Sequence, residues 1–283
     1  MSDKLRVSEA TGLLTFLNAQ LKGWARNKIK QRLKTGCVLV NDQLVRQHDY
    51  SLESGDEVEV RASPKNMKGE NIQLEILYSD RDLVAINKPA GLLSVASADE
   101  NKRHALAILR SQLSRSKRSV SLWPVHRLDR DTSGVLLFAT SREMREEVNA
   151  GWSNTDKIYL AVVDGCPKPD QGTIDQPLRL DEERYQMHVG PHPEAKEAIT
   201  HYCTQRTVSD RSLLEVRLET GRQHQIRAHL AWLGHPVIGD SRYGADGPRM
   251  GLHALRLSIT KPKTGKRLTF EAPAPDDFLD LIR

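Results

Sequence analysis

The first sixty residues carry apolar side chains at helical spacing, followed by short alternating segments. Leucines between residues 11 and 21 recur three and four positions apart, which predicts an amphipathic helix. A second helix is predicted over about 25–35, with Gly36 as its stop signal. Two short strands, 37–40 and 57–60, complete a small unit of helices and strands.

Beyond residue 72 the pattern changes to short apolar or alternating runs, which are typical of strands. These runs predict strands at 74–78, 83–86, 135–139, 157–165, 196–202 and 213–218. Helical spacing predicts helices at about 99–113 and over 226–233. A further short helix is predicted to end at about residue 150. A polar stretch with a proline and a glycine, 63–71, is predicted to be a linker. We therefore expect two domains, 1–62 and 72–283.

Composition places the chain among globular proteins. It has 283 residues, of which 38% are hydrophobic and 28% charged. The formal net charge of +5 favours a negatively charged partner, although alone this is a weak signal. Three scattered cysteines form no metal or disulfide pattern, and neither a signal-peptide core nor a run of ~18 apolar residues is present. We expect a cytoplasmic protein that does not enter a membrane.

The predicted second helix is strongly basic. Its cations are Arg26, Lys28, Lys30, Arg32 and Lys34, with no acidic residue among them. A solvated helix face is the ordinary explanation, but five like charges repel one another unless a polyanion neutralises them, so nucleic-acid binding is the better interpretation. The segment 10–61 also resembles the S-four RNA-binding module, through its two helices, its Gly36–Asn41 run and its Gly55–Val58 run. This resemblance implies a small α/β RNA-binding domain over 1–62.

The densest polar cluster lies directly before an apolar run. The cluster extends from Pro124 to Gly134, and the uncharged strand 135–139 that follows it is predicted to be buried. Asp129 and Asp131 lie there among arginines. Asp, Thr, Ser and Gly are also common turn residues, so an ordinary turn and an active site both explain the cluster.

The string His126-Arg127-Leu128-Asp129-x-x-Thr132-Ser133-Gly134 resembles the signature of the RluA family of pseudouridine synthases. Further matches follow the order of that family along the chain: Asn87–Gly91, Lys157–Gly165, Thr220–Leu230, Gly234–Asp240 and Leu252–Ala254. The resemblance covers about residues 74–283. It implies an α+β catalytic domain with a mixed, mainly antiparallel sheet, and an enzyme that isomerises uridine in RNA.

The resemblance also implies roles for individual residues. Asp129 aligns with the nucleophile, Tyr159 would stack on the target base, and Arg227 would pair with the carboxylate and keep it ionised. Arg127 would occupy the space left by the extruded base. Further substrate-binding residues are implied around this catalytic set: His126, Lys157, Arg222, His224 and Gln225.

Pseudouridine formation breaks the N1–C1′ bond of a uridine, turns the base and rejoins it through C5. Nothing is oxidised and no water is consumed, so we expect no cofactor and no metal. Whether Asp129 attacks the sugar or promotes loss of the base to a glycal-like intermediate stays open at this point. His188 and His192 lie four apart, but Gly190 and Pro191 separate them and no ligand set is complete, so both are expected to be loop residues.

Two other classes of function fit parts of the sequence. A non-catalytic RNA-binding or ribosome-assembly factor would need only the basic N-terminal unit. A hydrolase would use Asp129 and Asp131 as acid and base, but turn residues two apart give no control over the carboxyl separation. For a synthase, large-subunit ribosomal RNA is the first candidate substrate and transfer RNA the second. No heptad pattern calls for a dimer, so we expect a monomer.

Overall fold

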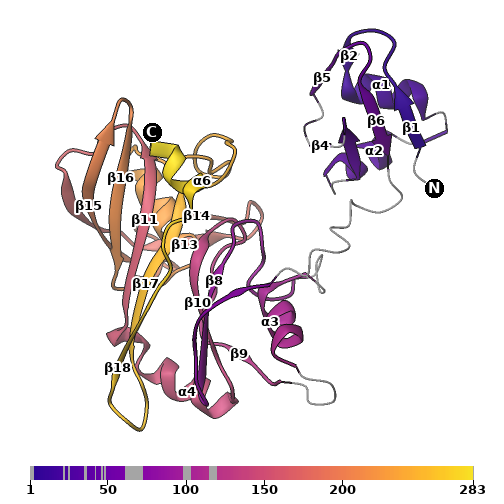
Figure 1. The fold of residues 1–283 in the computed structure, drawn as a ribbon. Helices are drawn as coiled ribbons and strands as arrows, with labels where there is room; N and C mark the ends of the chain where they lie inside the picture. Colours follow the sequence, from indigo (N-terminus) through magenta and orange to yellow (C-terminus); the bar gives the residue numbers. More distant parts are fainter. Residues whose placement is uncertain are drawn as a thin grey trace. The chain divides into compact units, whose positions relative to one another are not determined.

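The structure is a computed structural model that describes residues 3–282, apart from 22, 25, 35–36, 42, 46, 48, 61–72, 98–102 and 115–119. The chain forms two compact units, Met1–Ile72 and Gln73–Arg283 (Figure 1). The predicted linker, 63–71, lies outside the described residues.

The N-terminal unit combines two helices with a small antiparallel sheet. The helices are α1 (Leu13–Gln20) and α2 (Arg26–Lys34). The sheet order is β1-β6-β3-β4, and β2 pairs with β5. The strands are β1 (Asp3–Arg6), β2 (Thr11–Gly12), β3 (Val38–Val40), β4 (Gln43–Leu44), β5 (Ser51–Leu52) and β6 (Glu57–Val60). Leu13, Leu17, Ile29, Leu33 and Val58 share one buried core, so the apolar faces of both predicted helices are confirmed.

A ten-stranded mixed sheet forms the centre of the C-terminal unit. Its path is β12-β15-β16-β11-β17-β10-β8-β7, with β18 paired to β17 and β9 paired to β10. The strands are β7 (Glu75–Ser79), β8 (Leu83–Lys88), β9 (Trp123–Pro124), β10 (Ser133–Ala139), β11 (Asp156–Asp164), β12 (Gln171–Asp175), β15 (Ile199–Val208), β16 (Arg211–Leu218), β17 (Leu252–Thr260) and β18 (Arg267–Glu271). Every pairing except β10 with β17 is antiparallel, which confirms the predicted sheet type.

Helices cover this sheet with apolar faces. They are α3 (Ala105–Leu113), α4 (Arg142–Ala150), α5 (Gln225–Trp232) and α6 (Asp276–Leu279), with the short 3-10 helices η1 (Trp152–Asn154) and η2 (Asp280–Ile282). The apolar faces of α3 and α5 are the ones that the sequence predicts. Met144 and Val148 of α4 pack in one core with β8 and β10. Ile226 and Leu230 of α5 pack in another with β11 and β16. Burial of these apolar stripes fixes each helix on the sheet.

The segment between β11 and β15 differs from the sequence prediction. It contains β12 and a separate hairpin, β13 (Leu178–Asp181) and β14 (Gln186–Val189), none of which the scattered prolines and charges of this stretch reveal. His188 therefore lies on a strand, not in a loop, whereas His192 lies in a loop as predicted. Leu178 and Met187 of the hairpin pack with Ala228 of α5, so tertiary contact stabilises the hairpin.

The two antiparallel parts of the sheet join where β10 runs parallel to β17, as Figure 1 shows. Ser133 pairs with His253, and Gly134 pairs with Ala254. Gly134 has φ +112°, and a side-chain carbon there would lie 2.2 Å from the Ala254 carbonyl oxygen. Glycine is thus required at this position, because no other residue tolerates both the backbone conformation and the close approach. The polar cluster that precedes β10 is thereby placed at the junction.

Candidate active site

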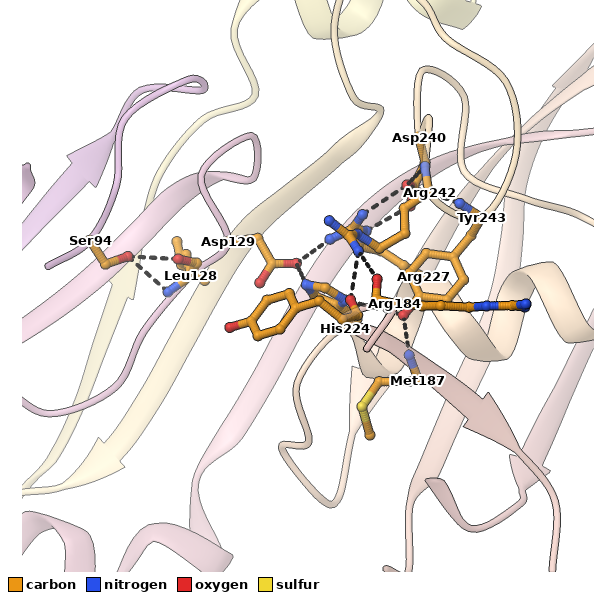
Figure 2. Close-up of polar contacts among 11 residues, drawn as sticks. Ser94, Leu128, Asp129, Arg184, Met187, His224, Arg227, Asp240, Arg242 and Tyr243 are labelled. Atoms are coloured by element: carbon orange, nitrogen blue, oxygen red, sulfur yellow. Dashed lines mark hydrogen bonds and ion pairs between the residues drawn. The ribbon is translucent and has the colours of Figure 1, made fainter. Parts of the chain in front are cut away.

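The backbone around Asp129 is held by hydrogen bonds on both sides. Ser94 Oγ donates to the Leu128 carbonyl oxygen (2.7 Å) and accepts from the Leu128 N–H (3.0 Å), as Figure 2 shows. Lys88 Nζ donates to the Arg130 carbonyl oxygen at 2.9 Å. Lys88 ends β8 and Ser94 lies six residues beyond it. The end of one strand therefore fixes the loop that leads into its neighbour.

Lys88 is fully buried and supplies three hydrogen bonds to backbone carbonyls. Its Nζ lies 2.9 Å from the Pro89 oxygen and 2.7 Å from the Leu92 oxygen, in addition to the Arg130 contact. Burial lowers the pKa of Lys88 to about 7, against the opposing charges of Asp131 and Asp129. A neutral amine has only two N–H donors and would leave one carbonyl unsatisfied. The three-carbonyl geometry therefore fits the ammonium form.

Arg227 joins two carboxylates. Its Nη1 donates to Asp129 Oδ2 at 2.8 Å, while Nε and Nη2 donate to the two oxygens of Asp240 at 2.6 and 2.8 Å. The Asp240 side chain is 1% exposed, whereas that of Asp129 is 30% exposed. Burial opposes the charge of Arg227, but the hydrogen bonds and charges of Asp240 and Asp129 raise its pKa above the ordinary value. Asp240 is thus the buried anchor, and Asp129 is the carboxylate that reaches solvent.

Gln225 organises the start of α5. Its Oε1 accepts from the Arg222 N–H and the Thr220 hydroxyl, and its Nε2 donates to the Ile199 carbonyl and Thr200 Oγ1. These contacts use the full hydrogen-bonding capacity of the buried amide. The resemblance implies that Gln225 binds the substrate, which stays a prediction; in the structure its amide holds the start of α5 against β15. Arg222 is exposed, and its Nε donates to the Glu197 carbonyl at 2.9 Å.

The turn after Asp240 adds a backbone hydrogen bond to Asp240 and the ring of Tyr243 next to Arg227. Asp240 Oδ1 accepts from the Arg242 N–H at 3.1 Å, and the Arg227 guanidinium lies 5.2 Å from the centre of the Tyr243 ring. Figure 2 shows Tyr243 and His224 next to the Asp129–Arg227–Asp240 group. His224 Nε2 lies 3.8 Å from Asp129 Oδ2. The predicted site residues Asp129, Arg227 and His224 are therefore brought together from two distant parts of the sequence.

Tyr159 lies on β11 at an irregularity of the sheet. The pairing of β11 with β17 shifts between Ile158 and Leu160, while Tyr159 itself pairs with Val216 of β16. A bulge of this kind changes the direction of the side chain it carries. Burial, and secondarily the charge of Asp129, raises the pKa of the Tyr159 hydroxyl. The phenol is therefore a neutral group in the electrostatic field of Asp129.

Two other predicted substrate-binding residues contact Trp152. Lys157 is buried, donates to the Glu219 carbonyl at 3.3 Å and lies 5.9 Å from the Trp152 ring centre. His126 Nε2 accepts from the Leu137 N–H at 3.2 Å, and its ring centre lies 5.2 Å from that of Trp152. These contacts support the sheet, so we assign neither residue a substrate contact. Arg127 is exposed, and within the described part of the chain no hydrogen bond holds its side chain.

The contact of His126 with β10 leads to a prediction about acid stability. Burial is the main cause that lowers the pKa of His126, to about 4. Below about pH 6.5 the unfolded histidine binds a proton that the folded one does not accept until about pH 4, so stability is lost as the pH falls through this window. At pH 5 the loss attributable to His126 should be about 2 kcal/mol relative to pH 7.

Urea unfolding at pH 7 and pH 5 tests this expectation. His126→Gln keeps an acceptor for the Leu137 N–H but cannot titrate, so its stability should fall less between the two pH values. Other buried histidines contribute equally to both proteins and cancel in the comparison. Equal losses in the two proteins would show that His126 does not cause the acid lability.

The basic side chains of α2 are partly described. Lys28 and Lys30 are exposed and Arg32 is half-buried, while the side chains of Arg26 and Lys34 lie outside the described residues. Lys28 Nζ lies 4.1 Å from the Trp24 ring centre, and the Arg32 guanidinium lies 5.7 Å from it. An aromatic ring within reach of both cations stabilises their positions on this helix.

Sequence reasoning missed several residues of this arrangement. Asp240 ends a run that matches the family, but nothing in its spacing links it to Arg227, 13 positions earlier. Tyr243 and Ser94 lie in irregular segments without periodicity. Lys88 lies inside the Asn87–Gly91 motif, but the sequence of this loop predicts only a Pro-Gly turn and gives no sign that the lysine is buried. Long-range partners of this kind become visible only in the folded chain.

Two absences are specific to the described residues. None of their helices is long and apolar enough to cross a membrane. Among the same residues, no three His, Cys, Asp or Glu side chains are grouped so that they could hold a metal ion.

Comparisons with known proteins identify the class. The profile of the family described as RNA pseudouridylate synthase matches residues 82–232. The solved structure of human RNA pseudouridylate synthase domain containing 4 aligns with a TM-score of 0.61 at 25% identity, over 73% of this chain and 91% of that chain. The matched range contains Asp129, Tyr159 and Arg227. The protein is thus an RNA pseudouridine synthase, an isomerase.

Relatives that align over most of both chains show to which family of RNA pseudouridine synthases the chain belongs. An uncharacterised RNA pseudouridine synthase of Bacillus subtilis, YlyB, is 35% identical over 94% of this chain and 91% of that protein. The ribosomal large subunit pseudouridine synthase D of Vibrio cholerae is 31% identical over 91% of this chain and 86% of that protein. That of Zymomonas mobilis is 33% identical over 92% and 89%. The chain belongs to the RluA family of RNA pseudouridine synthases.

Proposed function

We propose that the protein isomerises specific uridines of large-subunit ribosomal RNA, with Asp129 as the nucleophile. The observation that carries the proposal is the Asp129 carboxylate, which is bound through Oδ2 by Arg227 and is still 30% exposed. The names of the relatives from Vibrio cholerae and Zymomonas mobilis support ribosomal RNA as the target.

The proposed reaction begins at C1′ of an extruded uridine. An oxygen of Asp129 forms a bond to C1′ as the N1–C1′ bond breaks, and the uracil leaves with the electron pair on N1. After the base has turned, C5 attacks C1′ and the Asp129 carboxylate is released. The proton lost from C5 balances the one gained at N1, so the product is an isomer of the substrate.

Three further residues have proposed roles in this reaction. Tyr159 stacks on the extruded base, which its neutral phenol near Asp129 supports. Arg127 fills the space that the base leaves, and its exposed, unbound side chain in the described structure suits that role. Arg227 orients Asp129 through a guanidinium that Asp240 fixes on its opposite side.

We also propose that the N-terminal unit is an S-four-type RNA-binding domain over 1–62, joined by the linker 63–71 to the catalytic domain over 72–283. Exposed Lys28 and Lys30 on α2 support binding to phosphates, and Trp24 lies beside the same helix. Contacts of this kind give affinity that depends on salt more than on sequence. We expect the protein to act as a monomer, which light scattering on the purified protein tests.

A pseudouridine map of total RNA tests the target. Cells that lack the protein should lose pseudouridine at one or more large-subunit sites, and expression of the wild-type protein should restore it. Loss at a transfer-RNA site instead would favour the second substrate candidate. If no site changes, the proposed target is wrong, and a non-catalytic role in RNA binding or ribosome assembly becomes the better interpretation.

A further inference from the structure

His224 is an unusual residue at the N-terminus of α5. It adopts the left-handed backbone conformation, with φ +50° and ψ +18°, and its side chain is 8% exposed. Its ring lies between Tyr243 and Asp129, as Figure 2 shows. A buried histidine with one nitrogen near a phenol and the other near a carboxylate has a tautomer that its partners can define.

The hydrogen bonds of Tyr243 define this tautomer. Tyr243 Oη accepts the Met187 N–H at 2.8 Å and lies 3.1 Å from His224 Nδ1. Since its oxygen already accepts, the hydroxyl hydrogen is available to donate, and among the described residues His224 Nδ1 is the acceptor within reach. On this network we assign Nδ1 as the unprotonated nitrogen and Nε2 as the one that carries the hydrogen facing Asp129.

The charges around His224 keep it neutral. Burial lowers its pKa; Asp129 opposes this shift, Arg227 and Arg242 reinforce it, and Asp240 opposes it again. Tyr185 and Tyr243 present their rings edge-on to the imidazole, with centres 6.1 and 5.8 Å away. The ring is thus a neutral donor next to a carboxylate that Arg227 already pairs.

Both donors approach the same oxygen of Asp129. Arg227 Nη1 lies 2.8 Å from Oδ2, and His224 Nε2 lies 3.8 Å from it, just beyond hydrogen-bond distance. No hydrogen bond from the described residues reaches the other oxygen, Oδ1. Both donors therefore face Oδ2, whereas Oδ1 is available to act as the nucleophile.

We propose that His224 is a positioning residue: its neutral Nε2–H, aimed by Tyr243, closes onto Asp129 Oδ2 when RNA binds and turns Oδ1 toward C1′. A neutral donor orients the carboxylate without adding a second positive charge, which would make the oxygen a weaker nucleophile. This inference rests on the proposed role of Asp129.

Two substitutions of His224 separate a hydrogen-bond role from a backbone role. The amide nitrogen of His224→Gln reaches the position of Nε2 and keeps the donor. His224→Asn fits the left-handed backbone better and still accepts from Tyr243, but its amide is too short to reach Asp129. The assay is single-turnover isomerisation of large-subunit RNA from cells that lack the protein. The His224→Asn protein should be roughly 100-fold slower than the wild type, and the His224→Gln protein should be within roughly tenfold of it. RNA affinity, measured by filter binding, should not change in either variant.

A double substitution tests whether Tyr243 acts through His224. Tyr243→Phe alone should slow isomerisation, because the tautomer is no longer fixed. When Tyr243→Phe is added to His224→Asn, the rate of isomerisation should fall little further, because the Nε2–H donor that Tyr243 orients is already absent. The proposal is overturned if the His224→Asn protein is as fast as the wild type, or if the His224→Gln protein is as slow as the His224→Asn protein. It is also overturned if the loss of rate in the double variant equals the product of the losses in the two single variants. A wild-type protein without activity would instead contradict the proposed function itself.

Discussion

The Asp129→Asn protein should form no detectable pseudouridine while it folds normally and binds RNA as tightly as the wild type. The amide oxygen can still accept the Arg227 hydrogen bond, so the site keeps its shape, but an amide is not a nucleophile. Loss of the nucleophile lowers the rate of a serine protease by roughly 10⁶-fold. Large-subunit RNA from cells lacking the protein, incubated with each purified protein and analysed for pseudouridine by mass spectrometry, measures the loss.

Asp131→Asn is the matched control for this experiment. Asp131 lies two residues from Asp129 and is exposed in the turn. The same Asp-to-Asn substitution at this position leaves the contact of Arg227 with Asp129 in place. It should retain activity. Turnover by Asp129→Asn close to that of the control would show that Asp129 is not the nucleophile. Free uracil in the wild-type reaction would instead support the hydrolase alternative.

The sequence predicts the strands of this fold better than their arrangement. The run 135–139 is apolar because β10 is buried on both faces, and every residue of that strand is buried. Its parallel pairing with β17, which starts more than a hundred residues later, leaves no local signal. Only Gly134 in the motif reflects that contact, since its missing side chain makes room for Ala254. Local periodicity therefore gives many of the elements, but not β12, β13 or β14, and long-range packing decides which strands are neighbours.

The same distinction applies to the site. The resemblance to the RluA family predicts that Arg227 contacts Asp129, and the structure contains that contact. It also implies that Gln225 and Lys157 bind the substrate, and those two roles stay predictions. Gln225 and Lys157 make their hydrogen bonds within the protein, because the start of a helix and the end of a strand also need polar partners. Motif membership alone does not separate chemistry from scaffold.

Asp240→Asn should reduce both activity and stability, although Asp240 is not expected to touch RNA. Asp240 is buried and receives two hydrogen bonds from Arg227. With asparagine, an amide N–H would face a guanidinium N–H, and Arg227 would lose the anchor that directs its Nη1 to Asp129. Breaking a buried ion pair on one side costs about 3–5 kcal/mol. Urea unfolding measures this cost, and single-turnover isomerisation well below the unfolding midpoint should fall by roughly 100-fold.

Glu271→Gln is the control for this experiment, because it removes one charge from an exposed ion pair. Glu271 accepts from Arg256 Nε at 2.9 Å, but the two side chains are 54% and 41% exposed. Removing one charge from such a pair should cost less than about 1 kcal/mol and leave isomerisation unchanged. If Asp240→Asn loses stability but keeps its rate, Arg227 is held in place by Asp129 alone. If it loses rate without stability, the ion pair exists to orient the site and contributes little to folding. A loss of both, as we expect, means that one buried carboxylate serves the core and the nucleophile together.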